Sequence, residues 1–158
     1  MRPRPVDFAV FLSSLVLVAL QVASMQALAE SQGHHFAYVV IALALLGFGA
    51  SGTALSLLRV RVLSRGDRLL SDLPLAAGIG SVAALPLARL AAARVDFPLI
   101  FVDWRAWGPL MLSSGLACVP FFLGALFLGL AFMRDPRDIG RLYAANLLGS
   151  AAGAAAGL

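Results

Sequence analysis

The sequence contains five apolar segments, and four of them have 20 or more residues. They cover residues 8–29, 36–58, 73–92, 107–133 and 142–158. A helix rises about 1.5 Å per residue, so about 20 residues cross the roughly 30 Å hydrocarbon core of a bilayer. The sequence therefore predicts an all-α, polytopic helical membrane bundle with about five spans, forming a single transmembrane domain over residues 1–158.

The composition supports this class. Apolar residues make up 61% of the chain and charged residues 13%, whereas soluble domains have about 45–50% and about 25%. Disordered chains are polar and rich in charge, and a soluble fold of this size has too little interior for so much apolar surface. The fifth segment has 17 residues and reaches about 25 Å. We therefore expect it to be incomplete and the chain to be the front part of a longer protein.

The arginines predict an orientation. All 12 basic residues are arginine, and apart from Arg89 they lie before or between the apolar runs. This placement argues against a nucleic-acid surface. Three fall on one side of the membrane if every segment spans: Arg89, Arg94 and Arg105. The other side has nine: Arg2, Arg4, Arg59, Arg61, Arg65, Arg68, Arg134, Arg137 and Arg141. The positive-inside rule then places the N-terminus in the cytoplasm of a bacterial inner membrane.

Residues 96–107, which join the third and fourth segments, are neither a clear span nor a polar loop. Trp104 and Trp107 suit the headgroup boundary, where amphipathic rings are favoured. We expect an interfacial stretch on the outer side.

Two groups of glycines predict close helix packing. Gly47, Gly49 and Gly52 match G-x-G-x-x-G, but this pattern indicates a dinucleotide only between a strand and a helix. Inside an apolar span, small residues four apart are typical of helix contacts. The last segment repeats this spacing from Ala145 onward. Its glycines are Gly149, Gly153 and Gly157. The partner is left open: another span, a second copy in a homo-oligomer, or helices encoded downstream.

Polar residues inside membrane spans are candidates for function because their burial in lipid is costly. Gln26 and Glu30 lie four residues apart on one face, and with His35 they form a candidate proton- or cation-sensitive site at the outer mouth. The alternative is a solvated loop end. The full candidate polar membrane site is Gln21, Gln26, Glu30, His35 and Asn146.

Asn146 is expected to form a hydrogen bond between helices, at a different depth from Gln21. No catalytic motif is present in the sequence, and no spacing favours a metal ligand set. We predict no catalytic residue, metal or cofactor in this chain, and no nucleic-acid partner.

Two stretches carry a family resemblance. Residues 21–52 read QVASMQALAESQGHHFAYVVIALALLGFGASG, and residues 120–158 read PFFLGALFLGLAFMRDPRDIGRLYAANLLGSAAGAAAGL. Both resemble the membrane region of bacterial proteins fused to spermidine-synthase-like domains. The patterns shared are H-F-A-[FY] with ALLGFGASG, and P-F-F-x-x-G followed by G-R-L-Y-x-x-[ND]-L-x-G-x-x-x-G. Together they cover roughly half of the chain in the family's order.

The chain also departs from the family pattern. Gln21 stands where the family has Glu, and Gln26 where it has Arg, so an ion pair is replaced by two neutral amides. The matching positions are His35, Phe36, Tyr143 and Asn146. The family's soluble aminopropyltransferase-like domain, a Rossmann-type fold, is not among these residues, and no catalytic residue is carried over.

The resemblance implies a non-catalytic membrane domain that anchors a soluble aminopropyltransferase- or methyltransferase-like domain, or passes substrate to it. Two alternatives stay open. One is a small transporter, or half of one, for a polyamine-like cation or another small solute; the two glutamines weaken it because they remove charge. The other is a membrane packing module that assembles through its glycines.

Overall fold

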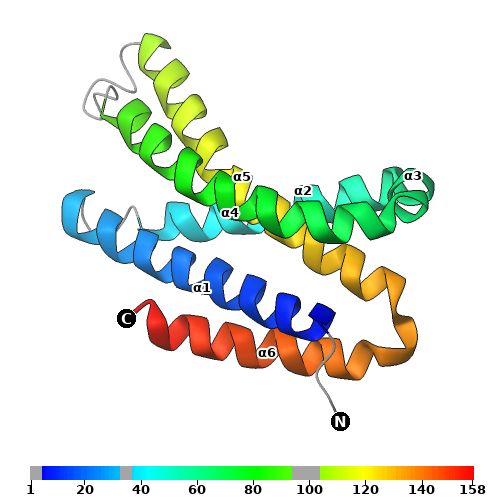
Figure 1. The fold of residues 1–158 in the computed structure, drawn as a ribbon. Coiled ribbons are helices and arrows are strands. Elements are labelled where there is room, and N and C mark those ends of the chain that lie inside the picture. Colours follow the sequence, from blue (N-terminus) through cyan, green and yellow to red (C-terminus); the bar gives the residue numbers. More distant parts are fainter. Residues whose placement is uncertain (1–4, 33–36, 94–103) are drawn as a thin grey trace.

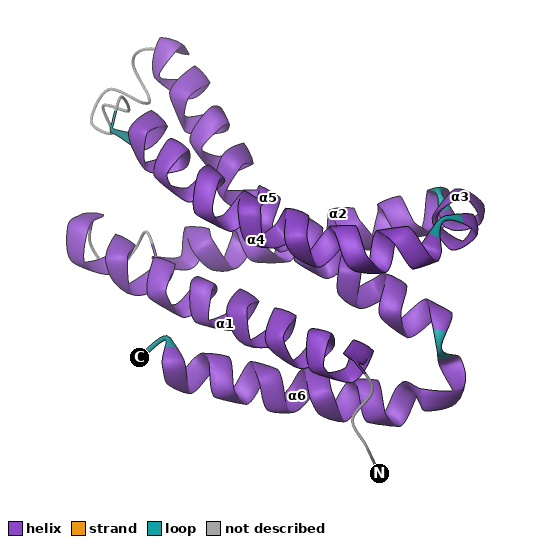
Figure 2. Cartoon of the chain, viewed as in Figure 1, coloured by secondary structure: helices purple, strands orange, loops and turns teal. Residues whose placement is uncertain are grey.

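The computed structural model describes residues 5–32, 37–93 and 104–158, and these residues form helices joined by short turns (Figure 1). No strand occurs in these three ranges (Figure 2), and the all-α prediction is confirmed. The helices are α1 (Pro5–Gln32), α2 (Ala37–Leu57), α3 (Arg59–Ser64), α4 (Gly66–Ala92), η3 (Trp104–Ala106), α5 (Trp107–Arg134), η4 (Pro136–Asp138) and α6 (Ile139–Ala156).

Four of the described helices are long and apolar enough to cross a membrane. They lie at Pro5–Gln26, Tyr38–Leu57, Gly66–Ala91 and Trp107–Arg134, and they correspond to the first four predicted segments. Large apolar side chains cover much of the exterior; Ile79 is 71% exposed and Val82 is 77% exposed. Such a surface fits contact with lipid.

The fifth predicted span is also a helix, α6, but it is not among these four. Arg141 and Asn146 interrupt its apolar surface, and its second half consists mainly of alanine and glycine. The small residues suit one face of this helix to close contact with another helix.

Helix ends differ from the predicted segment ends, most of all in α4. The helix begins at Gly66, although the apolar segment was predicted to begin at residue 73. Charged Asp67, Arg68 and Asp72 lie in the added turns. The apolar residues define only the part of a helix that suits lipid. Backbone hydrogen bonding extends the helix beyond them into the polar residues, so the helix begins before the apolar segment does. Pro74 and Pro86 lie inside this helix, and membrane helices tolerate such prolines.

Helix α5 lies at the centre of the packing and contacts α1, α2 and α4. Gly47 of α2 lies so close to it that an added Cβ would be 2.8 Å from the Phe121 Cβ and 2.9 Å from the Phe122 backbone N. The core is formed by Val10, Leu17, Ala44, Phe121, Phe127, Leu128, Ala131 and Leu142.

Helices α4 and α5 form an antiparallel pair, and α1 lies beside α6 (Figure 1). The predicted interfacial stretch falls largely on residues 94–103, outside the described part of the chain. Its two tryptophans are described, and both are exposed, Trp104 to 81% and Trp107 to 43%.

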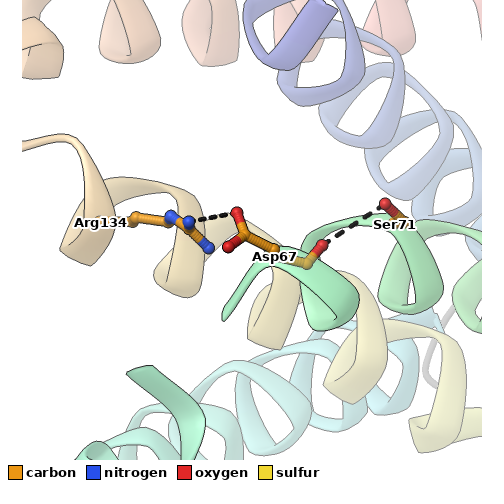
Figure 3. Close-up of polar contacts among 3 residues, drawn as sticks. All are labelled: Asp67, Ser71 and Arg134. Carbon is orange, nitrogen blue, oxygen red and sulfur yellow. Dashed lines mark hydrogen bonds and ion pairs between the residues drawn. The ribbon is translucent and has the colours of Figure 1, made fainter. Parts of the chain in front are cut away.

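The charged ends of the helices gather at one end of the bundle. Helices α1, α4 and α6 begin there, and α2 and α5 end there. At this end Arg134 of α5 donates to the carboxylate of Asp67 in α4, and the Ser71 Oγ lies 3.5 Å from the Asp67 carbonyl oxygen (Figure 3). The predicted orientation makes this the cytoplasmic end.

Reporter fusions test that orientation. Green fluorescent protein fused after Arg65 should fluoresce, and alkaline phosphatase fused there should be inactive, because the arginine-rich turn is retained in the cytoplasm. Fusions after Ala93 should show the reverse pattern. Active phosphatase after Arg65 would contradict the orientation.

Candidate functional site

The most specific set of contacts in the molecule joins α1 to α6. These helices are parallel neighbours, since Asp7 pairs with Arg141 near their starts and Gly157 lies against Val22 farther along (Figure 1). Parallel packing of the first and last described helices requires the long helices between them to return the chain to the starting end, and α2, α4 and α5 do so in three passes. We call the surface between them the α1–α6 interface.

An ion pair lies at the charged end of the α1–α6 interface. Arg141 donates to the Asp7 carboxylate, and the side chains are 33% and 15% exposed. Asp7 lies in the first turn of α1, where a negative charge complements the helix dipole. Arg141 lies in the first turn of α6, where a positive charge is unfavourable. The carboxylate of Asp7 offsets that cost, and it holds the two helix starts at the same level.

A buried polar contact lies deeper along the interface. The Ser14 side chain is 1% exposed. Its Oγ lies 2.6 Å from Asn146 Oδ1 and 2.8 Å from the Val10 carbonyl oxygen. A hydroxyl carries one proton and donates to one oxygen at a time. If the Asn146 side-chain amide is flipped so that Nδ2 faces Ser14, Nδ2 donates to the Ser14 Oγ. The Ser14 hydroxyl then donates to the Val10 carbonyl oxygen.

The three C-terminal glycines bring the two backbones close together. A Cβ added at Gly149 would overlap the carbonyl oxygen of Phe11, and one at Gly153 would overlap that of Leu15. At Gly157 an added Cβ would lie 2.8 Å from the Val22 Cβ. Two of these obstacles are backbone atoms, which no side-chain rotation can move. The helix that this glycine stripe contacts is therefore α1 of the same chain.

The other predicted packing glycines lie in α2 and behave differently from one another. Gly47 packs against α5, as described above. A Cβ at Gly49 or Gly52 would meet no atom within 4 Å in the described structure. Packing of these two glycines against a second copy stays a prediction.

Gln26, which was predicted at the outer mouth, lies at a different level along the helix axis from the Asn146 contact. Gln26 lies 12 residues after Ser14 in α1, about 18 Å farther along the helix axis, and its side chain is exposed. Gln21 is half-buried, seven residues after Ser14. Glu30 belongs to the last turns of α1. His35 lies outside the described residues, so the outer-mouth site stays a prediction.

Two shallow apolar depressions lie on the described surface. One, of about 440 Å³, is lined by Phe132, Ile139, Gly140 and Tyr143 at the charged end. The other, of about 470 Å³, is formed by one face of α4 from Pro74 to Ala83. Among the described side chains no group of three His, Cys, Asp or Glu residues is placed to hold a metal ion.

Comparison of the chain with models of known protein families, with curated proteins and with solved structures found no match.

Sequence reasoning did not identify Asp7, Ser14 or Arg141 as interface residues. Asp7 and Arg141 stand just before two apolar segments that enter the membrane from the same side, which was a usable signal for pairing. Ser14 lies inside the first apolar segment, but its small hydroxyl gave no indication of its partner.

Substitution of Gly153 by leucine should separate α1 from α6, because the Leu15 carbonyl oxygen occupies the space of the new side chain. Overpacking of this kind costs about 1–3 kcal/mol. Thermal unfolding in mild detergent measures the effect. The matched control is Gly52→Leu, which enters open space; equal losses of melting temperature in both variants would contradict the close contact.

The Ser14–Asn146 hydrogen bond should give a measurable coupling energy. In a double-mutant cycle with Ser14→Ala and Asn146→Ala, unfolding in detergent should show a coupling of about 0.6 kcal/mol, with about 1.7 kcal/mol as the upper bound for such bonds. Strictly additive effects of the two substitutions would show that the contact contributes nothing. A Thr53→Ala control removes a hydroxyl that bonds only within its own helix.

Proposed function

We propose that this chain is a non-catalytic, membrane-embedded domain that anchors a soluble aminopropyltransferase- or methyltransferase-like domain, or passes substrate to it, at the bacterial inner membrane. The observation that carries the proposal is spatial. The two stretches that resemble the spermidine-synthase-like membrane proteins, residues 21–52 and 120–158, contact each other where α2 meets α5 and where α1 meets α6. Gly47 packs on Phe121, and Val22 packs on Gly157.

These contacts support a shared structural role for the two stretches. Asn146, one of the positions that match the family pattern, also lies in the α1–α6 interface through its bond to Ser14. Tyr143, another matching position, is 56% exposed and lines the depression at the charged end. An exposed aromatic residue at the proposed cytoplasmic surface is available to a soluble domain, whereas the half-buried amide stabilises the scaffold.

The interlocked α1–α6 interface also favours a scaffold over a transporter. Transporters of the inverted-repeat type move one helical unit against another around a central site. Here the first and last described helices are joined by backbone contact, a partly buried hydrogen bond and an ion pair. Sliding between these two helices would break all three contacts together.

Photo-crosslinking in the source membranes tests the anchoring role. A benzophenone amino acid at Ile139, which is 52% exposed beside Tyr143, should give an adduct with a transferase-like domain, identified by mass spectrometry. The same group at Trp104 of η3, which precedes the start of α5 at the opposite end of the bundle, serves as the control and should not give this adduct. The proposal would be contradicted if position 139 crosslinks only to lipid and no transferase is encoded in frame or in an adjacent gene.

Uptake assays with proteoliposomes distinguish the anchoring proposal from the transporter alternative. Vesicles containing the purified chain should take up no more labelled spermidine than empty vesicles do. Time-dependent, saturable uptake would overturn the anchoring proposal and favour transport.

A further inference from the structure

Helix α3 is a short helix at the charged end, set between α2 and α4. Its flanking residues Leu58 and Arg65 leave helical geometry, with ψ near 14° at both positions. These two turns separate the axis of α3 from those of its neighbours, and in Figure 1 α3 is seen nearly along its own axis. A segment that crosses the bundle end in this way lies where membrane headgroups would be.

The position of α3 is fixed by the ion pair that follows it. Arg134 of α5 binds Asp67, and its guanidinium lies over Gly66, so that a Cβ added at Gly66 would be 2.6 Å from the Arg134 Nη1. The start of α4 is thereby held against the end of α5. Helix α3, immediately before it, contacts α2, α4 and α5.

Four arginines in and around α3 have exposed side chains, and none forms an ion pair within the described structure. They are Arg59, Arg61, Arg65 and Arg68. At the same end, Arg134 and Arg141 differ from these four because each is bound by an aspartate. Between residues 57 and 72 only Asp67 and Asp72 are acidic, and Asp67 is already bound to Arg134. The surface around α3 therefore carries an excess of positive charge.

Apolar side chains of the same segment are exposed as well. Val60 is 83% exposed, Leu57 79% and Leu63 40%. Val60 and Leu63 are three residues apart and share one side of the helix. Arg61, the residue after Val60, lies about 100° around the helix axis from it. No residue of α3 is buried. Basic and apolar residues on one short surface helix are typical of segments that lie in the headgroup region of a bilayer.

We propose that α3 and the four arginines form a binding surface for anionic phospholipids of the leaflet at the charged end. The guanidinium groups bind headgroup phosphates, and Val60 and Leu63 enter the boundary with the acyl chains. Arginine suits this role because its guanidinium can donate two parallel hydrogen bonds to phosphate. The inference depends on membrane embedding and is independent of any soluble transferase partner.

The test is a lipid titration of the purified full chain in neutral detergent, followed by native mass spectrometry. Phosphatidylglycerol should bind more tightly than phosphatidylcholine. Each arginine near an anionic surface contributes about fivefold to affinity. Arg61→Gln should therefore raise the apparent Kd for phosphatidylglycerol about fivefold, and the double variant with Arg65→Gln about 25-fold. The double Lys variant at these positions keeps the charge and should retain most of the affinity.

The matched control is Arg137→Gln, which removes an exposed charge at the same end of the bundle but outside α3. It should change the Kd less than twofold. A circular dichroism melting curve for each variant distinguishes loss of the binding site from loss of the fold. If the Gln variants unfold, the comparison of the Lys variant with the unsubstituted chain still tests the role of the charge. Inorganic phosphate, added at the same concentration as the lipid, should not displace phosphatidylglycerol from the chain.

Three results would overturn the proposal. Equal losses of affinity in Arg61→Gln and Arg137→Gln would indicate a general effect of net charge. Equal affinity for phosphatidylcholine and phosphatidylglycerol would exclude recognition of anionic headgroups. Displacement by inorganic phosphate would identify a site for small anions that does not require the lipid.

Discussion

The close approach of α1 and α6 is the constraint on which the rest of this structure depends. In lipid the hydrophobic effect does not draw helices together, so association relies on close packing and hydrogen bonds. Gly149 and Gly153 leave room for the backbone of α1, and Ser14 and Asn146 can bond only at that separation. A larger residue at either glycine would weaken the packing and the hydrogen bond at once.

The same contact determines how the chain closes. Because α1 and α6 are parallel, the helices between them must return the chain to its starting end, where Arg141 reaches Asp7. Helix α5 packs on α1, α2 and α4 and ends beside the start of α4, where Arg134 binds Asp67. The interior of the bundle is thus joined by packing, while the charged end is joined by ion pairs and carries α3 on its surface.

The sequence was sufficient for the helical class and for the positions of four membrane-length helices, because apolar runs of that length have few other stable states. Their ends were less predictable, as the early start of α4 at Gly66 shows. The spacing of Gly149 and Gly153 predicted a close contact but not its partner, because periodicity defines a face of one helix only. Ser14 was missed for the same reason: its role depends on Asn146, 132 residues away.

Disulfide trapping in membranes tests the α1–α6 interface most directly. In a Cys118→Ala background, Val22→Cys with Gly157→Cys places two Cβ atoms 2.8 Å apart, and a small separation of the helices brings them to the roughly 3.5–4.5 Å of a disulfide. Mild oxidation should give an intramolecular bond in a monomeric chain, and the pair Val22→Cys with Gly52→Cys should give none. No bond, or a bond formed only between two chains, would contradict the account, because α6 would then not pack on α1 of its own chain.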